Sequence, residues 1–494
     1  MHGVGTELSA ALDERPEWIC TDSRGASVSL RAGEWSVFVE YGRLFFSYWT
    51  SSRTVVWRVV GFRRNGDTLV LEVARLSGAE RARLELVPRA SAQAAAACVK
   101  QARRAQAMRL AALFCPAGGR IVELGLSRAP RPAQAGRYAR IIIESSAGRL
   151  AIAGPVADVS PQEADSFLAA SLGWFVRLRE RQRPVERFAL AVQSALSAAI
   201  AKRLALLRDE WREAIRLFAV DETGDAVRPW PLVSLAELLA TAAPLSALSP
   251  AEMSRTAQTL LALAPDAIDV VHARGGETLR FHGLPFARVR RVVGRERAWF
   301  GIGARRVLDD ESWPELVRLI AELKEHRRAD ASFRRHVFHR AAPEAWLESL
   351  LRRRIDALDP GLRLAPLHAQ FRVPRDAEDA RPVDLVAQRK DGRIVVIELK
   401  VREDPGFLIQ AADYWRRVEA ERRAGRLSRL FPDAPLADAP AIVYLAAPAL
   451  CFPKNVWALA RTIDPQIEIY RLDLNEDWRA GVRVARRTRL TASD

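Results

Sequence analysis

The chain has 494 residues, of which 49% are hydrophobic, and its formal net charge is +16. This length predicts several domains rather than one, and the apolar content is sufficient for packed cores. The cysteines are scattered without a Cys-x-x-Cys pair, which argues against a zinc site and favours a reducing, cytoplasmic location. The N-terminus has no signal-peptide pattern, and charged residues interrupt the most apolar stretch, residues 188–207, so no membrane span is expected.

The first part of the chain is predicted to be rich in β-strands. Strands are expected at residues 36–41, 44–48, 55–62 and 68–74, with Asn65-Gly66 as a hairpin turn. Aromatic residues are dense here, and two interpretations of them are open. They could form a stacking surface for bases, but the favoured interpretation is a small barrel or sandwich core that needs large side chains.

The middle of the chain alternates between predicted helices and strands. An alanine-rich helix is expected at residues 91–114, and strands at 121–126, 138–144 and 150–153. Helices are then expected over residues 161–218, and strands near 278–281 and 298–302 precede a helix at 312–326. The basic segment 327–340 is interpreted as a linker. The expected domains are a β-rich one (1–90), a mixed α/β and helical one (91–245), a small α/β one (246–335) and a C-terminal one (341–494).

The most informative pattern lies in two neighbouring strands near the C-terminus. Residues 381–387 and 393–401 are rich in β-formers, and Lys390-Asp391-Gly392 suits a three-residue hairpin loop closed by a left-handed glycine. This loop pairs Arg389 with Arg393 and therefore sets Asp384 opposite Glu398. Side chains alternate along a strand, so Asp384, Glu398 and Lys400 should share one face while Val383, Leu385, Ile397 and Leu399 fill the other.

Two adjacent carboxylates repel each other unless a cation lies between them. Mg²⁺, or Mn²⁺, meets that need, because such ions take oxygen ligands from carboxylates, water and phosphate. Lys400 could then orient the attacking water and offset the charge of a phosphate. The trio therefore predicts metal-dependent phosphodiester hydrolysis. The alternative, ordinary surface charges, is disfavoured because Glu398 and Lys400 interrupt an otherwise apolar strand.

These residues resemble the PD-(D/E)xK nuclease superfamily, although valine rather than proline precedes Asp384. The next segment places Gln410 four residues before Tyr414, and a Gln-x-x-x-Tyr helix after the Glu-x-Lys strand looks like the RecB-type and NucS-type branches. The resemblance implies a restriction-endonuclease-like α-β-β-β-α-β core over residues 341–494. It also implies that Gln410 lies at the metal and phosphate site, that Tyr414 braces it, and that the Leu399 carbonyl is a third metal ligand.

Three further predictions concern residues near this trio. The superfamily often places another acidic residue on the first helix, and Glu344 and Glu348 are both candidates, with Glu344 favoured by its Glu-x-x-Leu setting. Asp404 is expected to be the N-cap of the helix that carries Gln410. Arg416 and Arg417 of that helix are expected to point outward, where they could meet a phosphate backbone.

The positive charge lies mostly outside the C-terminal domain. Residues 341–494 contain 26 Lys and Arg against 23 Asp and Glu, which leaves 50 against 37 for residues 1–340. This distribution suggests that the N-terminal domains grip or select a nucleic-acid substrate. The leading hypothesis is a DNA nuclease; an RNA nuclease and a nuclease-fold binding or scaffold protein without turnover are the alternatives. A protein partner for the N-terminal region is possible, and the sequence does not specify an oligomeric state.

Overall fold

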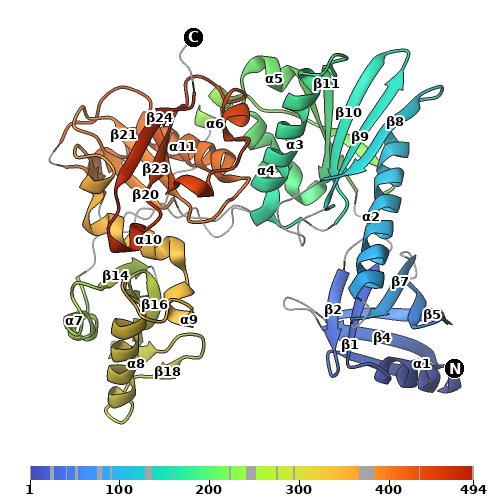
Figure 1. Ribbon diagram of the computed structural model, residues 1–494, viewed down its shortest axis with the longest axis horizontal. Helices are drawn as coiled ribbons and strands as arrows, with labels where there is room; N and C mark the ends of the chain where they lie inside the picture. The colour runs from blue at the N-terminus through green and yellow to red at the C-terminus, as the bar shows by residue number, and fades with distance from the viewer. Residues whose placement is uncertain are drawn as a thin grey trace. The chain divides into compact units, whose positions relative to one another are not determined.

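In the computed structural model (Figure 1), the described residues are 2–22, 27–40, 42–49, 54–74, 81–89, 92–127, 136–157, 159–221, 224–240, 252–273, 276–292, 295–365, 383–432 and 434–491. The chain forms two compact units: residues 1–160, 174–198 and 213–231, and residues 161–173, 199–212 and 232–494. None of the described helices is long and apolar enough to cross a membrane.

The first unit starts with α1 (His2–Asp13) and a seven-stranded antiparallel sheet in the order β2-β1-β7-β6-β5-β4-β3. Its strands are β1 (Glu17–Asp22), β2 (Ser27–Arg31), β3 (Trp35–Glu40), β4 (Arg43–Trp49), β5 (Thr54–Asn65), β6 (Thr68–Ala74) and β7 (Arg81–Pro88). The predicted hairpin turn is confirmed, because Asn65 pairs with Thr68. The aromatic residues are mainly core, as favoured: Phe46 and Trp57 are buried in one cluster, and Tyr48 packs against it.

The second sheet of this unit has six strands in the order β13-β12-β11-β10-β9-β8. The strands are β8 (Arg120–Leu126), β9 (Tyr138–Ser145), β10 (Gly148–Pro155), β11 (Arg187–Gln193), β12 (Ile215–Val220) and β13 (Val227–Trp230). The helices along the same stretch of chain are α2 (Ala92–Phe114), η2 (Pro161–Glu163), α3 (Ala164–Arg179), α4 (Ser194–Leu204) and α5 (Asp209–Ala214).

The prediction of helices throughout residues 161–218 is wrong at β11. Residues Phe188–Val192 of this strand are all buried, and the strand lies between two parallel neighbours, β10 and β12. A strand that is buried on both faces has a continuous apolar sequence, and periodicity alone cannot distinguish it from a buried helix.

The second unit contains a small five-stranded antiparallel sheet in the order β14-β15-β16-β17-β18. Its elements are α6 (Leu235–Ala240), α7 (Arg255–Ala262), β14 (Ile268–Ala273), β15 (Gly276–Phe281), β16 (Leu284–Val292), β17 (Arg295–Phe300), β18 (Arg306–Val307), α8 (Trp313–His326) and α9 (Val337–Arg340). The apolar faces of α7 and α8 pack on this sheet and form one core with it. The strands and the helix expected in this region are present.

The segment after α8 is packed rather than a free linker, so that interpretation is wrong. Arg327 is fully buried, and its guanidinium donates hydrogen bonds to five backbone carbonyls. The accepting residues are Phe281, His282, Phe338, Ala341 and Ala342. Burial lowers the pKa of Arg327 to about 9, and the charge of Arg479 lowers it further in the same direction. Basic composition suggested solvent exposure, but an arginine can be buried where backbone carbonyls satisfy its donors.

The C-terminal part of the second unit is a six-stranded mixed sheet in the order β19-β20-β21-β22-β23-β24 (Figure 1). Its elements are α10 (Pro343–Arg353), η3 (Ile355–Ala357), β19 (Arg363–Leu364), β20 (Leu385–Gln388), β21 (Ile394–Leu399), α11 (Phe407–Arg423), η5 (Ser428–Leu430), β22 (Ile442–Pro448), η6 (Ala449–Cys451), α12 (Val456–Ala460), β23 (Glu468–Leu474), η7 (Trp478–Ala480) and β24 (Val484–Arg489). The first three strands pair antiparallel, β21, β22 and β23 pair parallel, and β24 is antiparallel.

Two helices lie against this sheet. Leu347 and Leu351 of α10 share a buried cluster with Leu385, Ile397 and Leu399, so the predicted apolar face of the hairpin is filled. In contrast, α11 packs against β21 and β22, and no α11 residue belongs to that cluster. The opposite strand face therefore carries the polar side chains at the end of β21.

The structure defines the boundaries of two helices of this domain, and the start of α11 differs from the sequence analysis. The helix α10 ends at Arg353, and a short 3₁₀ turn continues its apolar stripe to the buried Leu358. Asp404 is not the N-cap of α11, because Gly406 occupies that position. The carboxylate of Asp404 instead accepts the Gly406 N–H at 2.9 Å, which is the Asx-turn alternative to capping that such residues favour.

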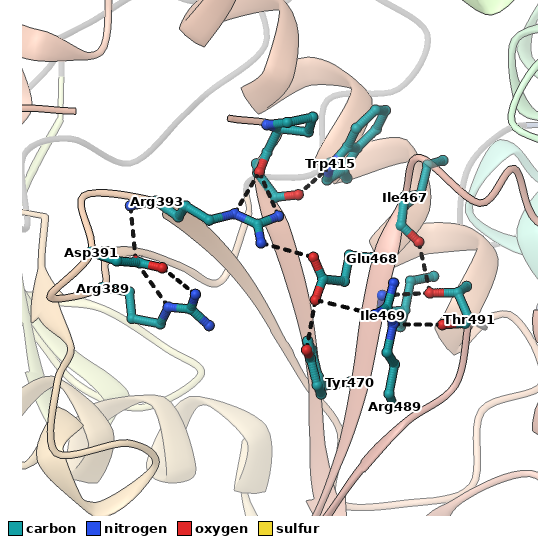
Figure 2. Close-up of polar contacts among 12 residues, drawn as sticks. Arg389, Asp391, Arg393, Trp415, Ile467, Glu468, Ile469, Tyr470, Arg489 and Thr491 are labelled. Carbon is teal, nitrogen blue, oxygen red and sulfur yellow. Dashed lines mark hydrogen bonds and ion pairs between the residues drawn. The ribbon is translucent and has the colours of Figure 1, made fainter. Parts of the chain in front are cut away.

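Ion pairs tie the start of β21 to the rest of the sheet (Figure 2). Arg393 donates to the Pro440 carbonyl at 2.9 Å and to Glu468 of β23 at 2.8 Å. Tyr470 donates to the other oxygen of Glu468 at 2.6 Å. The network spans β21, the approach to β22, and β23, so it holds in place the strand that carries Glu398.

Candidate functional site

The hairpin between β20 and β21 has the predicted three-residue loop. The Arg389 N–H donates to the Arg393 carbonyl at 2.8 Å, and the Gly392 N–H donates to the Arg389 carbonyl at 2.9 Å. Gly392 has φ of 82°, a left-handed conformation that glycine adopts without a steric penalty. Asp391 accepts from Arg389 at 2.9 Å, and this hydrogen bond lowers the pKa of Asp391 to about 2.

The predicted register of the hairpin is also confirmed. Leu385 pairs with Ile397, and one further step in each direction sets Asp384 opposite Glu398. The Leu399 N–H donates to Asp384 Oδ2 at 2.9 Å, which fixes that carboxylate against the end of β21. The geometry therefore brings Asp384 and Glu398 to one face of the sheet.

Glu398 is the most deeply buried member of this group. It is 0% exposed, and its Oε1 accepts a hydrogen bond from Lys400 Nζ at 2.8 Å. Its Oε2 is buried and has no hydrogen-bond partner among the described residues. Burial, followed by the negative charge of Asp384, raises the pKa of Glu398 well above its usual value. A buried carboxylate oxygen without a partner is costly, and such atoms require an explanation such as a bound ion.

The carboxyl group of Asp384 is also difficult to ionise. Burial raises the pKa of Asp384 to about 6, although Lys400 and the Leu399 N–H act in the opposite direction. Two neighbouring carboxyl groups that both resist ionisation form a place where a cation would be strongly favoured.

Lys400 supplies the positive charge beside these carboxyl groups. Burial favours the neutral amine, but Glu398, Asp384 and Glu344 outweigh that effect and hold the pKa of Lys400 above its usual value. Its ammonium group lies 4.0 Å from Asp404 and 5.9 Å from the centre of the Phe407 ring, at the start of α11. Lys400 is therefore a positioned cation at neutral pH and not a proton acceptor.

The two candidate glutamates of α10 have different surroundings. Glu344 is exposed in the first turn, and its charge acts on Asp384, Glu398 and Lys400. Glu348 is held in ion pairs with Arg352 at 2.7 Å and with Arg280 at 3.3 Å. The Glu344 carboxylate is thus the one that could bind a ligand at the site. The Glu348 carboxylate is instead held by Arg352 and Arg280.

Arg352 is a positioning residue that the sequence analysis missed. Its Nη2 donates to the Asp384 carbonyl at 3.1 Å, while its Nε donates to Glu348. The pair therefore anchors the backbone of Asp384 to α10. The only signal for it in the sequence was the four-residue spacing of Glu348 and Arg352, which is common on solvated helix faces.

Gln410 and Tyr414 are joined to each other by a hydrogen bond, as the resemblance implied. Gln410 Nε2 donates to the Tyr414 hydroxyl at 2.9 Å, and both side chains are buried. Within the described residues, no hydrogen bond connects Gln410 directly to Asp384, Glu398 or Lys400. The brace is present, and the role of Gln410 at a metal and phosphate site stays a prediction.

The prediction that Arg416 and Arg417 point outward is wrong. Both are buried, and they donate to the two carboxylate oxygens of Asp413 at 2.7 and 2.6 Å. Helix α6 packs against α11, so this face is covered rather than open to a ligand. The sequence shows that α11 contains charged residues, but it does not show that they pair with each other inside the protein. Burial of this helix therefore could not be recognised from the sequence.

The described residues contain no cluster of three or more His, Cys, Asp or Glu side chains arranged to hold a metal. A cation at this site would take Asp384 and Glu398 as its carboxylate ligands. Mg²⁺ and Mn²⁺ accept such sites, because water, substrate phosphate and backbone carbonyls such as that of Leu399 complete their coordination.

No protein-family model, curated protein or solved structure matches this chain. Its function must therefore be inferred from the chemistry of the site.

Proposed function

We propose that the C-terminal part of this chain is a metal-dependent nuclease that hydrolyses phosphodiester bonds, with DNA as the favoured substrate. One observation carries the proposal: the buried Glu398 Oε2 has no partner and lies in a carboxylate pair with Asp384, beside the ammonium group of Lys400. A divalent cation would satisfy this oxygen and relieve the repulsion between the carboxylates.

Each residue of the site would have a separate role in the reaction. Asp384 and Glu398 would hold Mg²⁺ or Mn²⁺, which on binding polarises a phosphate and makes a bound water more acidic. In the metal-free protein the neighbouring carboxylates hold the pKa of Lys400 above its usual value, so Lys400 would supply a positive charge that stabilises charge developing on the phosphate. Tyr414 would hold the Gln410 amide in one orientation, and Glu344 would supply an additional acceptor at the exposed side of the site.

The order of elements supports this assignment. One helix, three antiparallel strands, a second helix and a parallel strand follow each other in residues 343–448, an order similar to the α-β-β-β-α-β core that the sequence resemblance implies. The Asp384–Glu398 register and the Gln410–Tyr414 brace agree with the same resemblance. The more basic residues 1–340 would then grip or select the substrate by neutralising phosphates.

The direct test uses the purified full-length protein. Labelled duplex, single-stranded and branched DNA, and RNA, are incubated with Mg²⁺, with Mn²⁺ or with a chelator, and the Asp384→Asn protein prepared in parallel is the control for contaminating nuclease. We expect metal-dependent cleavage of at least one DNA substrate by the wild-type protein only. Cleavage of RNA alone would redirect the proposal to an RNA nuclease, and equal cleavage by Asp384→Asn would overturn it.

Metal affinity should rise steeply with pH. The unfolded chain loses its carboxyl protons near pH 4, whereas in the folded, metal-free protein the pKa of Asp384 is raised to about 6 and the pKa of Glu398 is also raised well above its usual value. The folded state therefore binds more protons, so the metal-free protein loses stability as pH rises from about 4 through 6. A metal must displace these protons, and its binding is strengthened over the same interval.

Isothermal titration calorimetry at pH 6 measures this linkage. Titrations with Mn²⁺ in two buffers of different ionisation enthalpy should show release of about one proton or more for each ion bound. The Asp384→Asn protein should release fewer protons and bind Mn²⁺ more weakly. Binding of Mn²⁺ to the wild-type protein without proton release would contradict the assigned carboxylate pair.

A further inference from the structure

A small cavity lies beside the candidate active site. Its volume is about 230 Å³, and it is bordered by the loop before α10, the residues after β21 and the η7 turn. The lining residues are Arg340, Pro343, Val401, Arg402, Trp478 and Arg479. Val401 and Arg402 directly follow Lys400 in the chain, and Pro343 directly precedes Glu344. The cavity therefore lies at the same end of β21 as the proposed reaction centre, on the side of the sheet where Val401 and Trp478 join the apolar cluster that includes α10.

The charge in this cavity is not compensated. Among the described residues, Arg340, Arg402 and Arg479 have no acidic partner, whereas arginines elsewhere in the same sheet domain, such as Arg393 and Arg471, are paired with carboxylates. The Arg479 Nε is buried and has no hydrogen-bond acceptor in the described part of the chain. Burial and the charge of Arg334 both lower the pKa of Arg479, which is the result expected where cations gather without an anion.

Tryptophan side chains fix the position of Arg479. Its guanidinium carbon lies 4.3 Å from the centre of the Trp478 ring and 5.1 Å from that of Trp346. An arginine packed against two aromatic rings loses little freedom when it binds an anion, so its donors are preorganised. The N-terminus of α10 adds to the positive potential, because Ala342 provides no side-chain cap.

We propose that this cavity binds a phosphate group of the substrate strand close to the phosphodiester that is cleaved; this inference rests on the proposed nuclease function. Guanidinium groups recognise phosphate through paired hydrogen bonds, and here three of them converge on one cavity with no carboxylate. The phosphate would be either an internal phosphodiester or a terminal 5′-phosphate, since both present the same oxygens. Its binding would set the register of the strand relative to Asp384 and Glu398.

The test measures binding by the full-length protein in a Glu398→Gln background, which prevents cleavage. Arg340→Gln, Arg402→Gln and Arg479→Gln are compared with Arg363→Gln. Arg363 is an exposed arginine of β19, and it pairs with Gln388 near the hairpin, away from the end of β21 that carries Lys400. Arg340 and Arg402 are also exposed, so their replacement should leave the fold intact.

Fluorescence anisotropy with 3′-labelled DNA, with and without a 5′-phosphate, gives the affinity between 50 and 200 mM salt. Each cavity variant should bind roughly 5- to 10-fold more weakly than the Arg363→Gln control, with a salt slope smaller by about 0.9 on duplex DNA. A loss confined to 5′-phosphorylated DNA would identify a terminal phosphate, and a loss on both DNAs an internal one.

Failure of the phosphate-site proposal can be distinguished from failure of the proposed nuclease function. If the wild-type protein cleaves nucleic acid and the three cavity variants bind like Arg363→Gln with unchanged salt slopes, the cavity is not a phosphate site, although the nuclease assignment stands. If the wild-type protein neither binds nor cleaves nucleic acid, both proposals are overturned.

Discussion

Replacing Glu398 with glutamine should abolish nucleic-acid cleavage while the protein stays folded. The substitution removes a proposed metal ligand but keeps the size of the side chain. Loss of one preorganised electrostatic contact already costs roughly 3–4 kcal/mol of barrier, a rate decrease on the order of 10²–10³, and a lost metal ligand should cost at least as much. Cleavage by gel assay at saturating Mg²⁺ gives the rate.

The same variant should be at least as stable as the metal-free wild-type protein at pH 8. Glu398 is fully buried with an unpartnered oxygen and lies beside Asp384, so a neutral amide removes a buried charge and its repulsion with Asp384, whereas Lys400 keeps the carboxylates of Asp384 and Asp404 as neighbours. Thermal unfolding in chelator measures this effect, and added Mg²⁺ should raise the melting temperature of the wild-type protein only. A large destabilisation of Glu398→Gln together with residual cleavage would mean that Glu398 has a structural role and does not bind metal.

Glu421→Gln is the matched control for Glu398→Gln. Glu421 is also a buried glutamate of the same domain, but it accepts two hydrogen bonds from Arg426, at 2.8 and 2.9 Å. Here the amide should lower stability, because it leaves a cation without its partner, and cleavage should be unaffected below the melting temperature. The two isosteric substitutions should therefore separate the two readouts: only Glu421→Gln should lower stability, and only Glu398→Gln should abolish cleavage.

Local sequence was sufficient to predict the core of the candidate site. Lys390-Asp391-Gly392 determines a three-residue loop, and that loop fixes which residues of the two strands are opposite each other. Because the side-chain period is two, the position of Asp384 relative to Glu398 followed from the loop alone. Such inferences succeed where all the interactions lie within about twenty residues of chain.

Contacts between distant residues could not be predicted in this way. Arg280 reaches Glu348, and Arg327 donates to carbonyls from two other segments, yet both appear in sequence as ordinary basic residues. The strand β11 was predicted as a helix because its two parallel neighbours, which are distant in sequence, bury both of its faces. Burial by partners that are remote along the chain leaves no periodic signal in the buried segment itself.

The second large effect is expected for the stability of the protein, when the carboxylate between the buried arginines of α11 is removed. Asp413 is 1% exposed and accepts hydrogen bonds from Arg416 and Arg417. Although burial acts in the opposite direction, Arg416, Arg417 and the buried Arg203 together lower the pKa of Asp413. Asp413→Ala should destabilise this unit by about 3–5 kcal/mol, because it removes the buried carboxylate that Arg416 and Arg417 share. Denaturant unfolding followed by tryptophan fluorescence measures the change.

Asp438→Ala is the control for this substitution. Asp438 forms an ion pair with Arg422 at 3.1 Å but is fully exposed and screened by solvent, so its loss should change the free energy of unfolding little. Equal effects of the two substitutions would show that the Asp413 network does not stabilise the fold. If the expected difference is found, Asp413→Ala should also reduce cleavage near its lowered melting temperature, because α11 carries both the Gln410–Tyr414 brace and Phe407, whose ring lies beside Lys400. Addition of Mg²⁺ should restore only part of that stability, since the metal would bind at the end of β21 and would not replace the Asp413 carboxylate.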